Sequence, residues 1–424
     1  MKPAHLFVFL AISCGSVFAN DGPNILIYIA DDQFLSSVGC YGADPSHTPN
    51  IDRLAREGAR FTECFTPSSI CTPNRGVLLS GMYPLKNGAH PNHSGFYDGI
   101  RSLPNYMKEI AYRACIVGKD GIQKPSDMYK WEFRIKKSKQ HVSGANEPHQ
   151  DRHRKTRFDE VAKFLSSKDD RPFCLFHAAS LPHGPDVNEI PNGLKGYDAN
   201  NFLMDAELGQ YLDLLESHGL DKNTVVIYLN DNEARNDRTK NTLYETGIHI
   251  PMVIRWPGRI QPGSDIDTMV STLDLMPTLL KIAGGEIPAE MDGVSMLDVW
   301  DGKVDRLHED LFFSYTGVIV NDSGRQEKPF PMRAIRTDQY KYIRYLNPEI
   351  GHPKFKGQKF PAEELFDLRS DPEEKNNLAQ SAEHQQIKSQ LGRKVDEWMQ
   401  AMNDRGIESE LASLKKYPFG SKKK

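Results

Sequence analysis

Near its N-terminus the chain reads Ile25-Leu26-Ile27-Tyr28-Ile29-Ala30-Asp31-Asp32, an unbroken apolar run that ends in two carboxylates. A run without alternation between apolar and polar residues is typical of a strand in a parallel sheet that is covered on both faces. We therefore expect a central strand of an α/β protein here, with Asp31 and Asp32 at its carboxyl end.

Three more apolar runs of this kind follow in the first 235 residues, with helical segments between them. The runs are Ala114 to Val117, Phe173 to Ala179 and Thr224 to Leu229. Thr48 and Pro49 suit the N-cap and first turn of one helix, which Gly58 ends, and residues 200–218 form a second amphipathic segment. This alternation predicts an α/β fold with a large mixed, mostly parallel sheet sandwiched by helices.

The pattern changes after about residue 305. Residues 332–346 alternate enough for a hairpin, residues 364–368 are another strand candidate, and residues 385–402 have the pattern of a terminal helix. We therefore expect a large domain over residues 20–305 and a smaller α+β subdomain over residues 306–424, with an antiparallel sheet and a helix.

Composition and the first residues bound the class of protein. Of the 424 residues 38% are hydrophobic and 26% charged, as in globular proteins, and the net charge of -4 gives no general attraction for nucleic acid. Lys2, the short apolar stretch from Leu6 to Val17 and the small residues around Ala19 predict a signal peptide over residues 1–19. We expect a periplasmic or secreted protein that is not stably inserted in a membrane once this signal is removed.

Each of the four predicted strands is followed by polar or ionisable residues. These are Asp31-Asp32, Gly118-Lys119, Leu181-Pro182-His183 and Asp231-Asn232. Open α/β sheets bind ligands outside the carboxyl ends of their strands, so these groups would share one crevice. Their oxygen atoms favour a hard cation, Ca²⁺ or Mg²⁺, which would relieve the repulsion among the carboxylates. The alternative for each group alone is ordinary turn chemistry.

Cysteine usage draws attention to Cys71. Of six cysteines, Cys14 lies in the predicted signal, and the odd number that remains leaves at least one without an intramolecular partner. Cys71 precedes a short helix with Pro73 in its first turn and Gly81 past its end. A nucleophile at a helix N-terminus gains from the dipole and the free amides. The alternative is a buried structural cysteine.

The segment around Cys71 resembles a known signature. Cys71-Thr72-Pro73-Asn74-Arg75-Gly76, continued by Leu79-Ser80-Gly81, looks like that of sulfatases of the alkaline phosphatase superfamily, in which the cysteine is oxidised to formylglycine (3-oxoalanine). The resemblance covers essentially the whole mature chain, and Arg101-Ser102-Leu103-Pro104 and Pro331-Met332-Arg333 look most like N-sulfoglucosamine sulfohydrolases, the sulfamidases. It implies that residues 20–305 are catalytic, that a formylglycine-generating enzyme matures the chain, and that the substrate is a sulfated oligo- or polysaccharide carrying O- or N-sulfate.

The same resemblance implies roles for the residues that match the family pattern. One hydroxyl of the hydrated aldehyde at position 71 would attack sulfur, and the other would later help to expel sulfate. A calcium ion, or Mg²⁺, would polarise that group and hold a sulfate oxygen. Its ligands would be Asp31, Asp32, modified Cys71, Asp231 and Asn232.

The remaining roles concern charge and protons. Arg75 would stabilise the formylglycine hydroxyl, and Lys119 and Lys240 would neutralise sulfate oxygens. His183 would protonate the leaving group, because its ordinary pKa lies near neutrality. The residues expected to contact substrate are His93, Lys119, His183 and Lys240.

One position departs from the family pattern. Gly121 stands where the family usually has a histidine, two residues after the lysine of Gly118-Lys119. Asp120, His90, His93 or His141 is a candidate substitute, or a water molecule serves instead, with His93 favoured among the residues because its loop approaches substrate in sulfamidase relatives.

Two other functions remain open at this stage. A phosphatase or phosphodiesterase of the same superfamily would hold two zinc ions, but Asp231-Asn232 in place of Asp-His argues against it. A non-catalytic binder of sulfated glycans is suggested by Gly121, but such a binder has no need of an oxidisable cysteine.

Overall fold

The computed structural model describes residues 22–119, 129–138, 140, 155–236, 238–320, 326–352 and 360–416. The predicted signal peptide and the positions of Asp120, Gly121 and His141 lie outside these ranges. No helix within them is long and apolar enough to cross a membrane.

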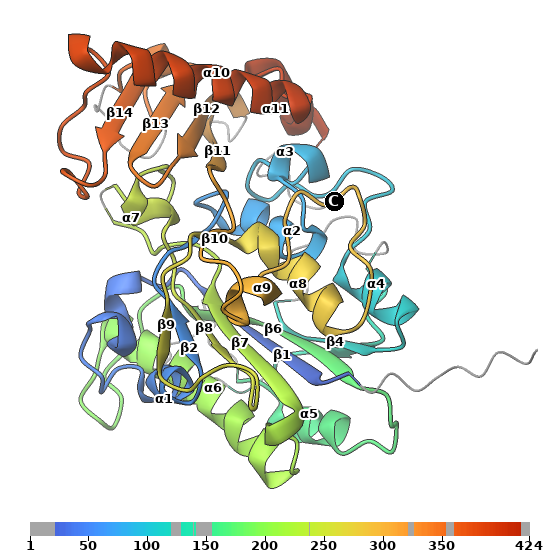
Figure 1. Ribbon diagram of the computed structural model, residues 1–424. Coiled ribbons are helices and arrows are strands. Elements are labelled where there is room, and N and C mark those ends of the chain that lie inside the picture. The colour runs from blue at the N-terminus through green and yellow to red at the C-terminus, as the bar shows by residue number, and fades with distance from the viewer. Residues whose placement is uncertain are drawn as a thin grey trace, which may run out of the picture.

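An eight-stranded sheet forms the centre of the larger part of the molecule (Figure 1), in the order β5-β4-β6-β1-β7-β8-β2-β9. Neighbours along β5-β4-β6-β1-β7 are parallel, whereas β8 runs antiparallel to both β7 and β2. The bounds are β1 Asn24–Asp31, β2 Ala59–Phe61, β4 Arg113–Gly118, β5 Phe133–Ile135, β6 Phe173–Pro182, β7 Thr224–Asn230, β8 Met252–Arg255 and β9 Ser264–Ile266. The four strands predicted from apolar runs are thus present, and the prediction of a mixed, mostly parallel sheet is confirmed.

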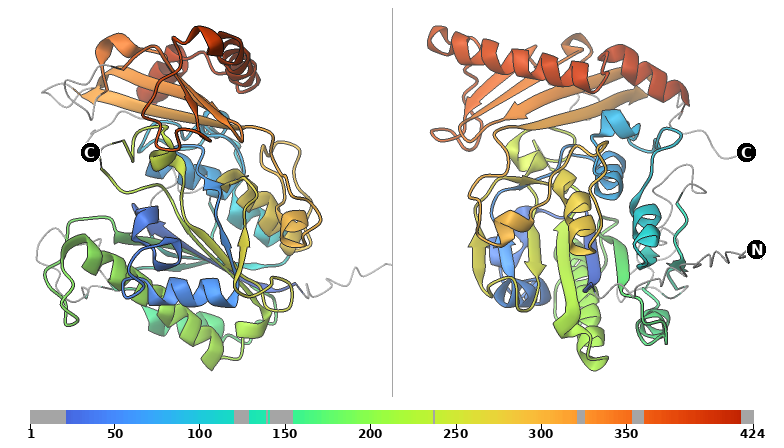
Figure 2. Two further views of the ribbon diagram at one scale, coloured as in Figure 1. Left: turned by 60° about the vertical axis from the view of Figure 1, so that its left-hand side comes forward. Right: turned by 45° about the vertical axis from the view of Figure 1, so that its right-hand side comes forward.

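Helices cover both faces of this sheet, as the two views of Figure 2 show. One face carries α2 Cys71–Ser80, α4 Leu103–Glu109, α8 Leu275–Ile282 and α9 Leu297–Trp300, and the other carries α1 Pro49–Glu57, α5 Phe158–Leu165 and α6 Gly196–Ser217. The short helices α3 Pro84–Asn87 and α7 Glu245–Ile248 lie outside these two layers. The prediction for α6 started it at residue 200, four residues late, because Gly196 and Asp198 in its first turn are poor helix formers. A two-stranded sheet of β3 Cys64–Phe65 and β10 Val270–Ser271 lies beside α2 and α8.

The two faces of β1 show why its apolar run is continuous. Ile25, Ile27 and Ile29 belong to a core that includes residues of α2, α4 and α8. Leu26, Tyr28 and Ala30 belong to another, which includes residues of α1, α5 and α6. Successive side chains of a strand point to opposite faces, so a strand between two helical layers needs apolar residues at every position.

A smaller antiparallel sheet, β11-β12-β13-β14, lies across one end of the molecule with α10 and α11 on its outer side (Figure 2). The bounds are β11 Leu311–Val320, β12 Gln326–Arg336, β13 Tyr340–Tyr345, β14 Glu363–Asp367, α10 Gln385–Ala401 and α11 Ile407–Lys416. The predicted hairpin, strand and helix correspond to β12-β13, β14 and α10, and the expected C-terminal antiparallel sheet with a helix is confirmed. Neither β11 nor the largely polar α11 was predicted from the sequence, and the predicted domain boundary near residue 305 stays a prediction.

Candidate active site

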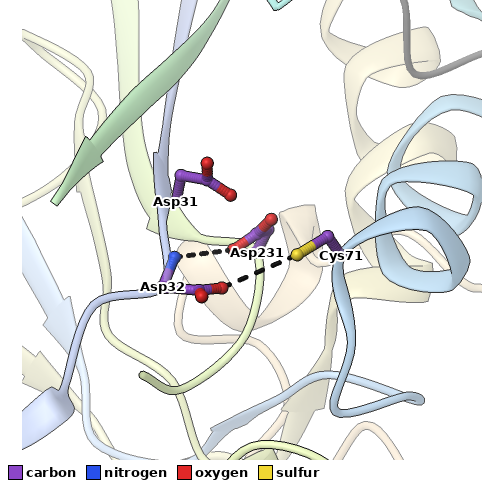
Figure 3. A group of neighbouring side chains, drawn as sticks. All are labelled: Asp31, Asp32, Cys71 and Asp231. Carbon is purple, nitrogen blue, oxygen red and sulfur yellow. Dashed lines mark hydrogen bonds between the residues drawn. The ribbon is translucent and has the colours of Figure 1, made fainter. Parts of the chain in front are cut away.

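Three parallel strands end at the same edge of the large sheet and bring their polar residues together there. Asp31 pairs in register with Pro182, and Ala30 pairs with Asn230, so the residues that follow β1, β6 and β7 start from one level. One ligand atom from each of Asp31, Asp32, Asp231 and Cys71 lies within 4.8 Å of the others (Figure 3). The strand-end pattern in the sequence therefore located a real convergence.

Cys71 reaches this point because α2 starts there. It is the first residue of the helix, Pro73 lies in the first turn, and Gly81 follows the last turn with a φ of 67°. A left-handed conformation of this kind is the usual way for glycine to end a helix. The Cys71 Sγ lies 3.6 Å from Asp32 Oδ1, and burial raises the pKa of the thiol.

Arg75, one turn further along α2, holds two of the carboxylates. Its Nε donates to Asp231 Oδ2 at 2.7 Å, and its Nη2 donates to Asp31 Oδ1 at 3.2 Å. All three side chains are at most 1% exposed. Charge-assisted bonds of this kind orient the carboxylates and offset part of the cost of burying them.

Two lysines supply further positive charge. Lys119, directly after β4, forms an ion pair with Asp31, and Lys240 forms one with Asp32. Lys240 Nζ also lies 3.2 Å from Cys71 Sγ. His183, directly after β6, places Nε2 3.3 Å from Asp32 Oδ2. The sequence-predicted cations and histidine thus all lie around the carboxylates and Cys71.

Burial and charge oppose each other in this cluster. Burial alone would raise the pKa of Asp31, but Lys119 and Arg75 outweigh it and hold that pKa well below its usual range. Burial would likewise lower the pKa of Lys240, but the charges of Cys71 and Asp32 raise it instead. For Asp231 burial outweighs Arg75 and raises the pKa. The carboxylate with the least local compensation is therefore the one that would gain most from a bound cation.

The donor set fits a hard divalent cation. Asn232 donates through Nδ2 to Asp32 Oδ1 at 2.8 Å, which leaves its Oδ1 buried and without a hydrogen-bond partner. A buried acceptor of this kind costs free energy unless something binds it. Three carboxylates and one unpaired amide oxygen in one place match the oxygen ligands that Ca²⁺ and Mg²⁺ take.

A cleft of about 380 Å³ opens onto this cluster. Its lining includes Asp32, His183 and Lys240 together with His93. Two bonds tie the His93 loop to the start of α2: His93 N donates to Thr72 Oγ1 at 3.1 Å, and Thr72 N donates to Asn92 Oδ1 at 3.3 Å. His93 has a φ of 64°, a conformation that costs free energy in residues other than glycine and is concentrated at functional sites.

Several residues that line the cleft were not predicted from the sequence. Phe34, Asn92, Tyr197 and Arg235 line the cleft but follow no pattern that sequence analysis used. His90, named above as a candidate substitute for the family's histidine, lies elsewhere: its Nδ1 is 2.9 Å from Glu410 Oε2 in α11. Of the substitutes within the described residues, His93 is the one that lines the cleft.

The sequence of the chain matches known protein families over most of its length. Residues 23–285 match the sulfatase family, and residues 237–401 match the family described as N-sulphoglucosamine sulphohydrolase, C-terminal. The chain belongs to the sulfatase family. This sulfatase is therefore a sulfuric ester hydrolase, and the resemblance read from its sequence is confirmed.

Individual sulfatases and solved structures are also similar to this chain. It is 32% identical to an ulvan-active sulfatase of Formosa agariphila, over 91% of this chain and 81% of the relative. A structure solved in complex with its substrate, D-glucosamine-2-N,6-O-disulfate, shares the fold with a TM-score of 0.69 and 18% identity, over 91% of this chain and 99% of the other.

The fold by itself does not separate sulfatases from related hydrolases. A phosphonate monoester hydrolase of Agrobacterium radiobacter gives a TM-score of 0.68 at 17% identity, over 90% of this chain and 96% of the other. Membership of the sulfatase family therefore rests on the sequence matches, and the chemistry must be argued from the residues of the site.

Proposed function

We propose that this sulfatase is exported and removes O- or N-linked sulfate from a sulfated oligo- or polysaccharide, with formylglycine at position 71 and a divalent cation, Ca²⁺ or Mg²⁺. The observation that carries the proposal is the convergence of Cys71 with Asp31, Asp32 and Asp231 within 4.8 Å. The ulvan-active relative and the structure with a glucosamine disulfate support a carbohydrate substrate.

The cation would be held by Asp31, Asp32, Asp231, Asn232 and modified Cys71. When bound, it would supply Lewis-acid polarisation of the nucleophile and of a sulfate oxygen. The chain's own charges support this: three carboxylates face Arg75, Lys119 and Lys240, so the cluster without the ion is close to neutral. A divalent ion would leave the site positive, which suits an anionic sulfate group.

Formylglycine would be made by a separate maturation enzyme that supplies a two-electron oxidant such as O₂, so that the Cys71 side chain (CH₂SH) loses H₂S and gains one oxygen atom to become an aldehyde (CHO). Once hydrated, the aldehyde would supply a hydroxyl nucleophile and so divide the displacement at sulfur into two steps. Lys240, 3.2 Å from the sulfur of Cys71, and Arg75, on the same face of α2 as Cys71, would orient that group and stabilise charge on it.

His183 would carry the proton to the leaving oxygen or nitrogen. Its Nδ1 lies 3.0 Å from the carbonyl oxygen of Gly184, and its Nε2 lies 3.3 Å from Asp32 Oδ2 at the wall of the cleft. A carbonyl can only accept, which favours the tautomer or charge state with a proton on Nδ1. His93 is the second histidine of the cleft, and we assign it to substrate contact and to the step that the histidine missing at Gly121 would assist.

The experiment uses the full chain produced with a formylglycine-generating enzyme. We expect mass spectrometry to show the oxidised Cys71 peptide, ion chromatography to detect sulfate released from sulfated oligosaccharides, and chelation to stop that release until Ca²⁺ or Mg²⁺ is restored. Asp231→Asn should lose cation binding in calorimetry together with release.

Other outcomes would identify the rival functions. Two bound zinc ions with phosphate-ester hydrolysis would indicate the phosphatase. An oxidised protein that binds sulfated oligosaccharides without releasing sulfate from any of them would indicate the binder.

A further inference from the structure

Arg235 is a cation of the cleft that the roles assigned above leave unused. It lies in the loop after β7, which also carries Asp231 and Asn232, and it lines the cleft beside Lys240 and His183. Unlike Arg75, Lys119 and Lys240, its side chain is exposed, and it has no ion-pair partner among the residues that the structure describes. No ion pair within the described part of the chain therefore neutralises its charge.

Hydrogen bonds close the base of this loop and fix the main-chain position from which the Arg235 side chain extends. The carbonyl oxygen of Ala234 accepts from Lys240 N at 3.4 Å and from Thr239 Oγ1 at 2.7 Å. Arg235 thus leaves the main chain next to Lys240. Both cations also lie within electrostatic range of Tyr315 in β11, whose pKa burial raises and these two charges partly lower.

Lys240 and Arg235 differ in burial, so they would contact different anionic groups of a bound substrate. Lys240 is buried beside Cys71 and Asp32, where the reacting sulfate must sit. Arg235 stands at the exposed side of the cleft. The guanidinium offers a planar pair of donors that matches a carboxylate or a sulfate, and it has a higher preference for such groups than an ammonium has.

The cleft also has an aromatic wall, formed by Phe34 and Tyr197. The Phe34 and Tyr197 rings pack at 5.2 Å between centroids, and Tyr197 OH accepts from Phe34 N at 2.8 Å, which fixes the pair. Rigid aromatic faces bind apolar ligand surfaces at low entropic cost. A pyranose ring has such a face, so the wall can seat the sugar that carries the reacting sulfate.

We infer that Arg235 forms a subsite for a second anionic group on the substrate, a carboxylate or another sulfate close to the reacting sulfate. This rests on the proposed function and narrows it: the preferred substrates are polyanionic saccharides rather than sugars with a single charge. Arg235 is thus a specificity-determining residue that touches the substrate away from the reacting atoms.

The test measures binding, so that it does not depend on turnover. Calorimetry with calcium present would be done on the Cys71→Ala protein, which cannot form formylglycine, with and without Arg235→Gln. The probes are two singly charged sugars (glucosamine N-sulfate and N-acetylglucosamine 6-sulfate), glucosamine N,6-disulfate, and a disaccharide of a uronate and N-sulfoglucosamine. Arg369→Gln is the matched control, because Arg369 is also exposed but lies away from this cleft.

We expect Arg235→Gln to weaken binding of the two doubly charged probes about tenfold or more, and of the singly charged probes by less than about twofold. Arg369→Gln should change neither. The probe with the larger loss identifies the second group as carboxylate or sulfate. Equal weakening of all probes, or of none, would overturn the subsite. Absence of sulfate release by the mature wild type would instead refute the proposed function, so the two failures differ.

Discussion

Two clusters of buried charge in this sulfatase are built in different ways. The first contains Asp31, Asp32 and Asp231 with their cations and opens onto the cleft. The second joins the loop of His90 to the C-terminal sheet and α11. There Arg333 donates to Asp404 Oδ2 and to Glu410 Oε1, both at 2.7 Å, while His90 Nδ1 lies 2.9 Å from Glu410 Oε2.

The two clusters differ in what they leave unpaired. In the first, Arg75 Nη1 and Asn232 Oδ1 are buried without hydrogen-bond partners. In the second, Arg333 also uses Nη1, which donates to the carbonyl oxygen of Met332 at 2.9 Å, and among the described side chains none of this cluster's polar atoms is buried and unpaired.

This difference indicates that the first cluster is a binding site and that the second supports the fold. A cluster whose polar atoms satisfy one another has nothing to offer a ligand, and its disruption leaves a charge stranded in the core. A cluster with unpaired buried atoms beside a cleft has the requirements of a binding site. Changes in the first cluster should therefore affect chemistry, and changes in the second should affect folding.

The largest expected effect is the loss of turnover in Cys71→Ala. We expect sulfate release to fall at least a thousandfold, because the group that becomes the nucleophile is gone. The free energy of unfolding should change by less than about 1 kcal/mol, since Cys71 is only partly buried and no ion pair is broken. Ion chromatography and urea unfolding measure the two quantities. A variant that released sulfate at the wild-type rate would show that position 71 is not the nucleophile.

The converse change is Arg333→Met in the second cluster. Removal of the guanidinium leaves Asp404 and Glu410 buried without their cation, which should lower the free energy of unfolding by about 3 to 5 kcal/mol. Urea unfolding followed by tryptophan fluorescence would measure it.

Arg405→Met is the control for that change, because the Arg405–Glu408 pair is exposed and its loss should cost less than about 1 kcal/mol. A drop for Arg333→Met no larger than that of the control would remove the distinction between the clusters.

The comparison also shows what the sequence could predict. The carboxylates of the first cluster were predictable because each lies at, or directly after, the end of an apolar strand, and parallel strands in one sheet must end near one another. The cation at Lys240 required the family resemblance, because it lies in the loop after β7 but well beyond the end of that strand.

The second cluster could not be predicted in that way. His90 and Glu410 are 320 positions apart, and their contact depends on how α11 packs against β12. Arg235 presents a related difficulty, because an exposed arginine in a loop has no local pattern that distinguishes it from a solvated one. Local strand patterns therefore identified the centre of the site, whereas its specificity and its support depend on tertiary packing.

The smallest expected effect is in the pH dependence of the second cluster. Burial would raise the pKa of Glu410, but His90 and Arg333 outweigh it and lower that pKa from 4.5 to about 2. A carboxyl whose pKa is lower in the folded state stabilises the fold above its unfolded pKa, and this contribution is lost as the pH falls toward the folded pKa. Between about pH 5.5 and pH 3, Glu410 should therefore cost the wild type about 2 kcal/mol of unfolding free energy.

The measurement is urea unfolding at these two pH values. Glu410→Gln should be less stable than the wild type at the higher pH and lose less stability on acidification, because it has no proton to take up at this position. Glu408→Gln, an exposed change in the same helix, should follow the wild type at both. Parallel losses in wild type and Glu410→Gln would mean that the carboxylate of Glu410 does not contribute to folding as its contacts with His90 and Arg333 indicate.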